Sequence, residues 1–325
     1  MIYPSFLKKG DTIGISAPSA GVGRKLESFD QSLSVLKQNY KLKETKHVRV
    51  NDTRGGDAKQ RGQEVTELFQ DKTVDFVMCA AGGDFLNEMI PYVNFDILKK
   101  NPKWLMGFSD PTGILYPYTT LYEVATIYGA NAGDYDLSPL PEYLKNNLDI
   151  IKGNLIEQKD YKTFQKALPW DVDGFQPDTK VQWQSTVKEL NIQGRCIGGC
   201  IDGLKDLIGT KFDGTYQFLE RYKEDGFIWY FDNFSLSAEN LYRTLIQMKY
   251  ADWFVNAKAI IIGRTLIESS DTGMTYEDAM KFIDDVPVIY NADIGHTMPH
   301  MTMINGAILK LAYKENHATL NFVLE

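Results

Sequence analysis

The sequence predicts a two-domain α/β protein, and three observations support that prediction. The chain has 325 residues, which is long for one hydrophobic core and fits two domains of roughly 150 residues each. Hydrophobic residues make up 43% of the chain and charged residues 24%, so packed interiors are expected and extended disorder is not. In the first half, apolar segments alternate with segments of helical spacing, which indicates a largely parallel sheet with crossover helices.

The elements of the first half follow from the spacing of apolar residues. Strands are predicted at 11–19, 43–50, 74–81 and 103–108. Helices are predicted at 24–40, 58–71 and 85–93. Ligands of such sheets bind beyond the carboxyl ends of the strands, where this chain has the loops SAPSAG, AAGGD and GFSD.

The periodicity fades between about 150 and 185, where Lys, Asp, Gln and Pro mix with isolated aromatics. This composition predicts an extended connection between domains. Strands at 226–233 and 257–265 and a helix at 237–254 then indicate a second α/β unit. The expected division is an N-terminal α/β domain at 1–155, a linker at 156–185 and a C-terminal α/β domain at 186–325.

Charge and hydropathy exclude several function classes. The formal net charge of -8 argues against a nucleic-acid partner, because phosphate binding normally needs a basic face. The first residues lack the order of a secretory signal, and no stretch is long and apolar enough to span a bilayer. We therefore expect a cytoplasmic protein with no membrane partner. Neither G-x-G-x-x-G nor G-x-x-x-x-G-K-[ST] follows a predicted strand, which disfavours a nucleotide-binding enzyme.

The cysteines are expected to be buried free thiols. Their number is odd, and Cys196 and Cys200 share a segment that contains no second Cys or His pair at the spacing of a zinc site. We therefore expect no metal site at these cysteines.

The stretch WLMGFSDPTGIL, residues 104–115, has two interpretations. In the first, Ser109 or Asp110 caps a helix that Pro111 begins. In the second, Ser109 lies on a tight strand-to-helix turn that presents its hydroxyl to a cleft as a nucleophile. The twelve residues alone leave both open.

Six motifs across the chain together resemble the LD-carboxypeptidases, a family of serine peptidases that includes muramoyltetrapeptide carboxypeptidases and microcin C self-immunity proteins. The motifs are GDTIGISAPS, AAGGD, NPKWLMGFSDPTGIL, GRCIGGCIDGL, FIWYFDNFSLSAENLYRTL and PVIYNADIGHTMP. The resemblance implies a Rossmann-like, glutamine-amidotransferase-like N-terminal domain with a parallel sheet and a C-terminal swivelling β/α domain. It also implies a homodimer, a small peptide substrate and no cofactor.

The resemblance implies a catalytic triad divided between the domains. Ser109 takes the position of the nucleophile, His296 that of the general base, and Asp232 falls where the family has a glutamate. A serine hydroxyl needs an imidazole to take its proton, and a carboxylate must orient that imidazole. For the oxyanion hole the resemblance points to the backbone N–H of Asp110 and to that of Gly83 or its neighbour Gly82.

Two features depart from the family or compete with these assignments. Asp232 is one methylene shorter than glutamate, which leaves three alternatives: a working Ser109, Asp232 and His296 triad, recruitment of Glu239, or a weakened enzyme. His300 is the other histidine of the PVIYNADIGHTMPH segment and is expected to be a loop residue. We favour Asp232 as the acid and His296 as the base.

The expected function is hydrolysis of the L,D-amide bond that releases the terminal D-alanine of murein tetrapeptides, as in peptidoglycan recycling. One alternative is the immunity-type hydrolysis of an amide in an aminoacyl-nucleotide antibiotic. Another, from a different class, is a two-lobed protein that binds a peptide or muropeptide and has lost efficient catalysis.

Overall fold

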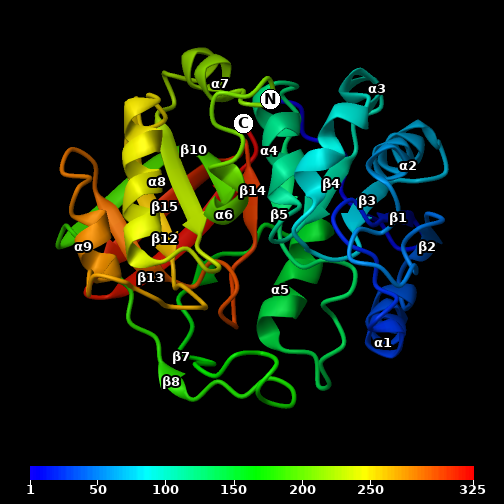
Figure 1. Cartoon of the computed structure of the whole chain (residues 1–325), viewed down its shortest axis with the longest axis horizontal. Helices are drawn as coiled ribbons and strands as arrows, with labels where there is room; N and C mark the ends of the chain where they lie inside the picture. Colours follow the sequence, from blue (N-terminus) through cyan, green and yellow to red (C-terminus); the bar gives the residue numbers. More distant parts are fainter. The chain divides into compact units, whose positions relative to one another are not determined.

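The computed structural model describes residues 1–325 and divides into two compact units (Figure 1). The first contains Met1–Asn154 and Thr302–Ile304, and the second contains Leu155–Met301 and Asn305–Glu325. The expected mixed α/β fold is confirmed, with a parallel sheet in the N-terminal part and a separate sheet in the C-terminal part. None of the helices has the length and apolar composition that crossing a membrane requires.

The first unit is built on a six-stranded sheet in the order β14-β5-β4-β3-β1-β2. The strands in chain order are β1 (Thr12–Ser16), β2 (Lys41–Glu44), β3 (Phe76–Cys79), β4 (Trp104–Gly107), β5 (Thr126–Tyr128) and β14 (Met303–Asn305). The pairs within β2-β1-β3-β4-β5 are all parallel. Every residue of β3 and β4 is buried, as expected for strands covered on both faces.

The helices of the first unit connect these strands. They are α1 (Leu26–Lys37), α2 (Ala58–Gln70), α3 (Phe95–Lys100), α4 (Thr112–Thr120) and α5 (Glu142–Ile151). Helix α2 begins where its sequence dictates, because Asp57 and Gln60 form a reciprocal capping box.

Two expectations for the first unit need correction. Residues 85–93 form two 3₁₀ turns, η1 (Leu86–Glu88) and η2 (Ile90–Tyr92), in place of one helix, because Pro91 has no N–H to continue an α-helical ladder. The strand expected at 43–50 lies at Lys41–Glu44, and the residues after it form turns.

The second unit is built on an eight-stranded mixed sheet in the order β6-β16-β15-β10-β11-β12-β13-β9. Its central strands are β10 (Glu189–Cys200), β11 (Phe227–Asp232), β12 (Ala257–Gly263) and β13 (Val288–Ala292), which pair in parallel. An antiparallel hairpin, β15 (Ile308–Lys314) and β16 (His317–Val323), extends it beside β10. The helices are α6 (Ile201–Leu204), α7 (Thr215–Arg221), α8 (Ala238–Tyr250) and α9 (Tyr276–Met280).

The segment 156–185, expected to be a linker, contains four two-residue strands. These are β6 (Gln158–Lys159), β7 (Thr163–Phe164), β8 (Thr179–Lys180) and β9 (Gln184–Ser185). Strands β6 and β9 form the two edges of the eight-stranded sheet. The segment packs against the second unit because its aromatic residues are anchors: Trp183 is fully buried, and its Nε1 donates to the Asp293 carboxylate at 2.9 Å.

Candidate active site

Ser109 lies on a sharp turn between β4 and α4 in the first unit. Its φ angle is 70°, a left-handed conformation that non-glycine residues adopt rarely and at a cost. The turn is crowded: a Cβ on Gly107 would lie 2.6 Å from Pro111 and 2.8 Å from the Cys79 sulfur. A strained serine directly after a buried strand and before a helix has the geometry of a nucleophile elbow.

The helix-capping interpretation of this turn does not describe the contacts at the start of α4. Pro111 occupies the N-cap position, and no side-chain hydrogen bond caps the helix there. The Asp110 carboxylate instead accepts hydrogen bonds from the Ser19 hydroxyl and from the Leu86 N–H, the latter at 3.0 Å. Asp110 therefore ties the elbow to the loops that follow β1 and β3. Burial raises the pKa of Asp110, and the hydrogen bonds from Ser19 and Leu86 oppose that rise.

The glycine pair after β3 lies beside Ser109. A Cβ on Gly82 would be 3.0 Å from Cβ and 3.3 Å from Oγ of Ser109. A Cβ on Gly83 would be 2.6 Å from the Ser19 hydroxyl oxygen. Side chains at either position would meet neighbouring atoms, so both residues allow the backbone to approach closely.

Sequence reasoning missed Arg61, which contacts the same two loops as Asp110. Its side chain is fully buried, and Nη1 donates to the carbonyl oxygens of Pro18, Ser19 and Phe85 at 2.9, 3.2 and 3.1 Å, while Nη2 pairs with Glu88. One guanidinium thus holds the loops after β1 and β3 together. The spacing of Arg61 with Val65 and Leu68 on the buried face of α2 is the signal that could have revealed it.

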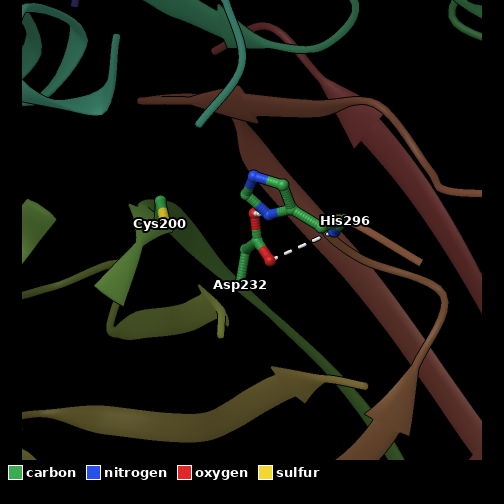
Figure 2. Close-up of side chains that lie close together, drawn as sticks. All are labelled: Cys200, Asp232 and His296. Atoms are coloured by element: carbon green, nitrogen blue, oxygen red, sulfur yellow. Dashed lines mark hydrogen bonds and ion pairs between the residues drawn. The ribbon is translucent and has the colours of Figure 1, made fainter. Parts of the chain in front are cut away.

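Asp232 and His296 come together in the second unit. Asp232 ends β11 with its side chain fully buried, and its Oδ2 lies 2.8 Å from Nδ1 of His296. Its Oδ1 accepts the backbone N–H of His296 at 3.2 Å (Figure 2). The His296 side chain is 13% exposed, so solvent or a ligand can reach the ring. The ring also packs on Phe234, with the two centroids 4.6 Å apart.

Gly295 explains how the short Asp232 side chain reaches the imidazole. Its φ angle is +100°, and a Cβ at this position would lie 1.9 Å from Oδ1 of Asp232. The backbone of the loop that carries His296 therefore approaches the Asp232 carboxylate as closely as only glycine permits.

Glu239, the alternative acid, is engaged elsewhere. Its Oε1 accepts hydrogen bonds from the Ser270 and Thr272 hydroxyls, both at 2.7 Å, and from the Thr272 and Asp271 N–H groups at 2.9 and 3.1 Å. These bonds hold the pKa of Glu239 well below its usual range. Glu239 therefore organises the loop before α9, and Asp232 is the carboxylate that contacts His296.

His300 lies on the same loop but is only 8% exposed. Burial lowers the pKa of His300 to about 4, against the attraction of the Asp232 carboxylate. It is therefore a neutral packing residue at neutral pH, more buried than the loop residue expected from the sequence.

A second buried ion pair supports the loop that carries His296. Asp293 pairs with Arg264, and its Oδ2 accepts the Trp183 Nε1–H and the Tyr161 N–H, both at 2.9 Å. The Arg264 guanidinium also lies 4.3 Å from the ring centroid of Phe164. The 156–185 segment is thereby fastened to the residues immediately before His296.

The cysteines are free and buried, as the sequence predicted. Cys200 ends β10 directly opposite Asp232 in the parallel register. Its sulfur, an Asp232 oxygen and a ring nitrogen of His296 all lie within 4.8 Å of one another.

The site residues predicted from the sequence are divided between the two units. Ser109, Asp110 and Gly83 belong to the first unit, and Asp232 and His296 belong to the second.

The chain matches two family models. Residues 13–129 match the LD-carboxypeptidase N-terminal domain, and residues 193–311 match the LD-carboxypeptidase C-terminal domain. Among curated proteins, one named as a carboxypeptidase from Vibrio cholerae is 26% identical, and the alignment covers 92% of this chain and 91% of that protein. The microcin C7 self-immunity protein MccF of Escherichia coli is 25% identical, with 97% and 94% covered.

Solved structures share the fold. MccF in the wild-type apo state superposes with a TM-score of 0.82 at 23% identity over 100% of both chains. MccF has also been solved in complex with aspartyl sulfamoyl adenosine, again with a TM-score of 0.82. A muramoyltetrapeptide carboxypeptidase from Oxalobacter formigenes gives 0.75 at 18% identity, covering 96% of this chain and 98% of that one. The two matched models together span more than half of the sequence, so the chain belongs to the LD-carboxypeptidase family, a family of peptidases.

Proposed function

We propose that the protein is a serine-type LD-carboxypeptidase that cleaves a peptide amide through an acyl-enzyme, with the murein tetrapeptide as substrate and D-alanine as leaving group. The observation that supports this most strongly is the contact of 2.8 Å between His296 Nδ1 and the buried Asp232 carboxylate. An imidazole held in this way is oriented with its other nitrogen available as a base. The strained turn at Ser109 supplies the complementary nucleophile.

The proposed reaction has two halves, formation of an ester on Ser109 and hydrolysis of that ester. The Ser109 hydroxyl attacks the carbonyl carbon as His296 takes its proton, and Asp232 stabilises the imidazolium. The oxyanion accepts hydrogen bonds from the backbone N–H groups of Asp110 and Gly83, with Gly82 as the alternative to Gly83. His296 then protonates the amine of the leaving D-alanine. Water, deprotonated by His296, finally attacks the ester carbonyl, and His296 returns the proton to the Ser109 oxygen as the carbon–oxygen bond to Ser109 breaks.

The test is release of D-alanine from a purified muramoyl tetrapeptide. We expect Ser109→Ala and His296→Gln to lose at least about a thousandfold in kcat/KM, as triad removals do. Ser34→Ala in α1 and His317→Gln, whose side chain is 76% exposed, are the matched controls and should keep activity. A serine-directed probe should label Ser109 in the natural chain and in the controls, but not after His296→Gln. Retained activity in Ser109→Ala would reject the assigned nucleophile.

The immunity-type substrate is the second candidate, favoured by the alignment with MccF over nearly the whole chain. In that case the same residues would hydrolyse an amide of an aminoacyl sulfamoyl nucleotide. Turnover of that compound without D-alanine release, and dependent on Ser109, would identify it. The non-catalytic alternative would be favoured if the protein binds muropeptide but turns over neither substrate and the serine-directed probe does not label Ser109.

The proposal also covers the oligomeric state, the cellular location and the size of the substrate. We propose a homodimer that acts in the cytoplasm on small peptides. Light scattering during gel filtration tests the dimer, and cell fractionation tests the location.

A further inference from the structure

Three side chains of types that can bind a metal ion come together at the carboxyl ends of β10 and β11. Cys200, Asp232 and His296 each offer a ligand atom, and these atoms lie within 4.8 Å of one another (Figure 2). The parallel register places Cys200 directly opposite Asp232. The cluster is therefore built from neighbouring strand ends and a loop, which is why the spacing of cysteines and histidines in the sequence did not reveal it.

The chemistry of the three side chains fits zinc. Zn²⁺ binds thiolate, imidazole and carboxylate, with bond lengths near 2.3 Å to sulfur and 2.0 Å to nitrogen or oxygen. In a tetrahedron these bonds put ligand atoms about 3.3–3.6 Å apart. Because the three atoms already lie within 4.8 Å, small side-chain rotations close the site. Three protein ligands leave a fourth position for water.

We propose that Cys200, Asp232 and His296 form a binding site for a thiophilic divalent cation such as Zn²⁺, and that occupancy of this site reversibly inhibits the protein. The inhibition rests on the proposed function, because a carboxylate and an imidazole that are bound to a cation cannot serve a serine nucleophile. The binding site itself does not depend on that function.

Binding balances the charge of the buried site. The Cys200 thiol releases its proton to solvent and binds as thiolate, while His296 binds as neutral imidazole and Asp232 as carboxylate. The two negative charges then neutralise the cation. Because the thiol must lose its proton to bind as thiolate, cation binding releases a proton and depends on pH.

Cobalt provides a readout that does not need activity, because a cobalt–thiolate bond has a near-ultraviolet charge-transfer band. The full chain is titrated with Co²⁺, and Zn²⁺ is then added to displace it. We expect the band in the natural chain and in Ser109→Ala. Cys200→Ser should lose the band and bind Zn²⁺ at least about tenfold more weakly.

Cys196→Ser is the matched control. Cys196 is equally buried on β10 but lies opposite Ile228, about 13 Å along the strand from Cys200 at 3.3 Å per residue. This variant should keep the band. If Cys200→Ser does not fold, Cys200→Ala and Asp232→Asn take its place, and both should weaken Zn²⁺ binding by the same tenfold or more.

The activity assay separates this inference from the proposed function. Zn²⁺ should inhibit D-alanine release at the concentrations that displace Co²⁺, and a chelator should restore the rate. Absence of a cobalt–thiolate band from the natural chain, or its persistence in Cys200→Ser, would overturn the metal site. A band with an unaffected rate would overturn the inhibition. A chain that shows the band but hydrolyses nothing would confirm the site and refute the proposed function.

Discussion

Replacement of Gly295 by alanine tests whether the close approach of its backbone positions Asp232 against His296 in the proposed triad. The added Cβ would lie 1.9 Å from Oδ1 and 2.3 Å from Cγ of Asp232. Carbon and oxygen atoms that are not bonded rarely approach within 3.0 Å, so the carboxylate or the loop must move by about 1 Å. Either movement separates Asp232 from the His296 ring.

The size of the effect follows from two separate terms. Misplacement of a catalytic group by about 1 Å costs on the order of a hundredfold in rate. The φ angle of +100° adds a backbone penalty of about 1–2 kcal/mol for any residue with a Cβ. We therefore expect kcat to fall about a hundredfold and the free energy of unfolding to fall by at least that backbone penalty.

Gly209→Ala separates these two terms. Gly209 has a φ angle of +75° in the same unit, but a Cβ there would have no atom within 4 Å. This control should lose similar backbone stability and keep its kcat. The assays are D-alanine release at saturating substrate and urea unfolding of each variant. A Gly295→Ala protein with the kcat of the natural chain would refute the argument that the glycine positions the Asp232 and His296 pair.

Three further predictions follow from the same contacts. Asp232→Glu should lower kcat by about a hundredfold, because the backbone of Gly295 leaves no room for another methylene. A variant that releases D-alanine faster than the natural chain would contradict this close fit. Gly82→Ala should slow labelling of Ser109 by a serine-directed probe about tenfold, because the new Cβ would lie 3.3 Å from Oγ, and an unchanged labelling rate would contradict it. His300 has a pKa lowered by burial to about 4 from 6.5, so the folded protein binds fewer protons than the unfolded chain between those values. The free energy of unfolding should therefore fall by up to roughly 3 kcal/mol as the pH drops from 6.5 to 4. In urea unfolding, His300→Gln should make this free energy less dependent on pH. A variant with an equally steep pH dependence would contradict a lowered pKa of His300.

The sequence predicted those helices and strands whose apolar spacing is clear within a single segment. Helix α2 (Ala58–Gln70) lies within the helix predicted at 58–71 from its apolar spacing, and β3 and β4 lie within the apolar runs predicted as strands. The two 3₁₀ turns around Pro91 were predicted as one helix because the apolar spacing outweighed the proline. The short strands within 156–185 could not be predicted, since pairing at a sheet edge with two residues leaves almost no periodicity.

The two residues that form the contact between Asp232 and His296 were predicted from the sequence, but the geometry of that contact was not. The sequence identified Asp232 and His296 and left Glu239 open. The bonds from Ser270 and Thr272 to Glu239, and the passage of Gly295 beside Asp232, depend on tertiary contacts between segments far apart in the chain. The ion pair of Asp293 with Arg264 and the hydrogen bonds from the buried Arg61 guanidinium likewise join distant loops, and no sequence motif predicts them.

The left-handed backbone at Ser109 sets stability against the proposed nucleophile role at a single position. A glycine would adopt its φ angle of 70° without the cost of about 1–2 kcal/mol that a side chain incurs there. Selection for stability alone would therefore replace the serine. Stabilising screens that do not measure turnover should enrich Ser109→Gly, and its recovery would mark residue 109 as one where the fold is kept below its stability optimum.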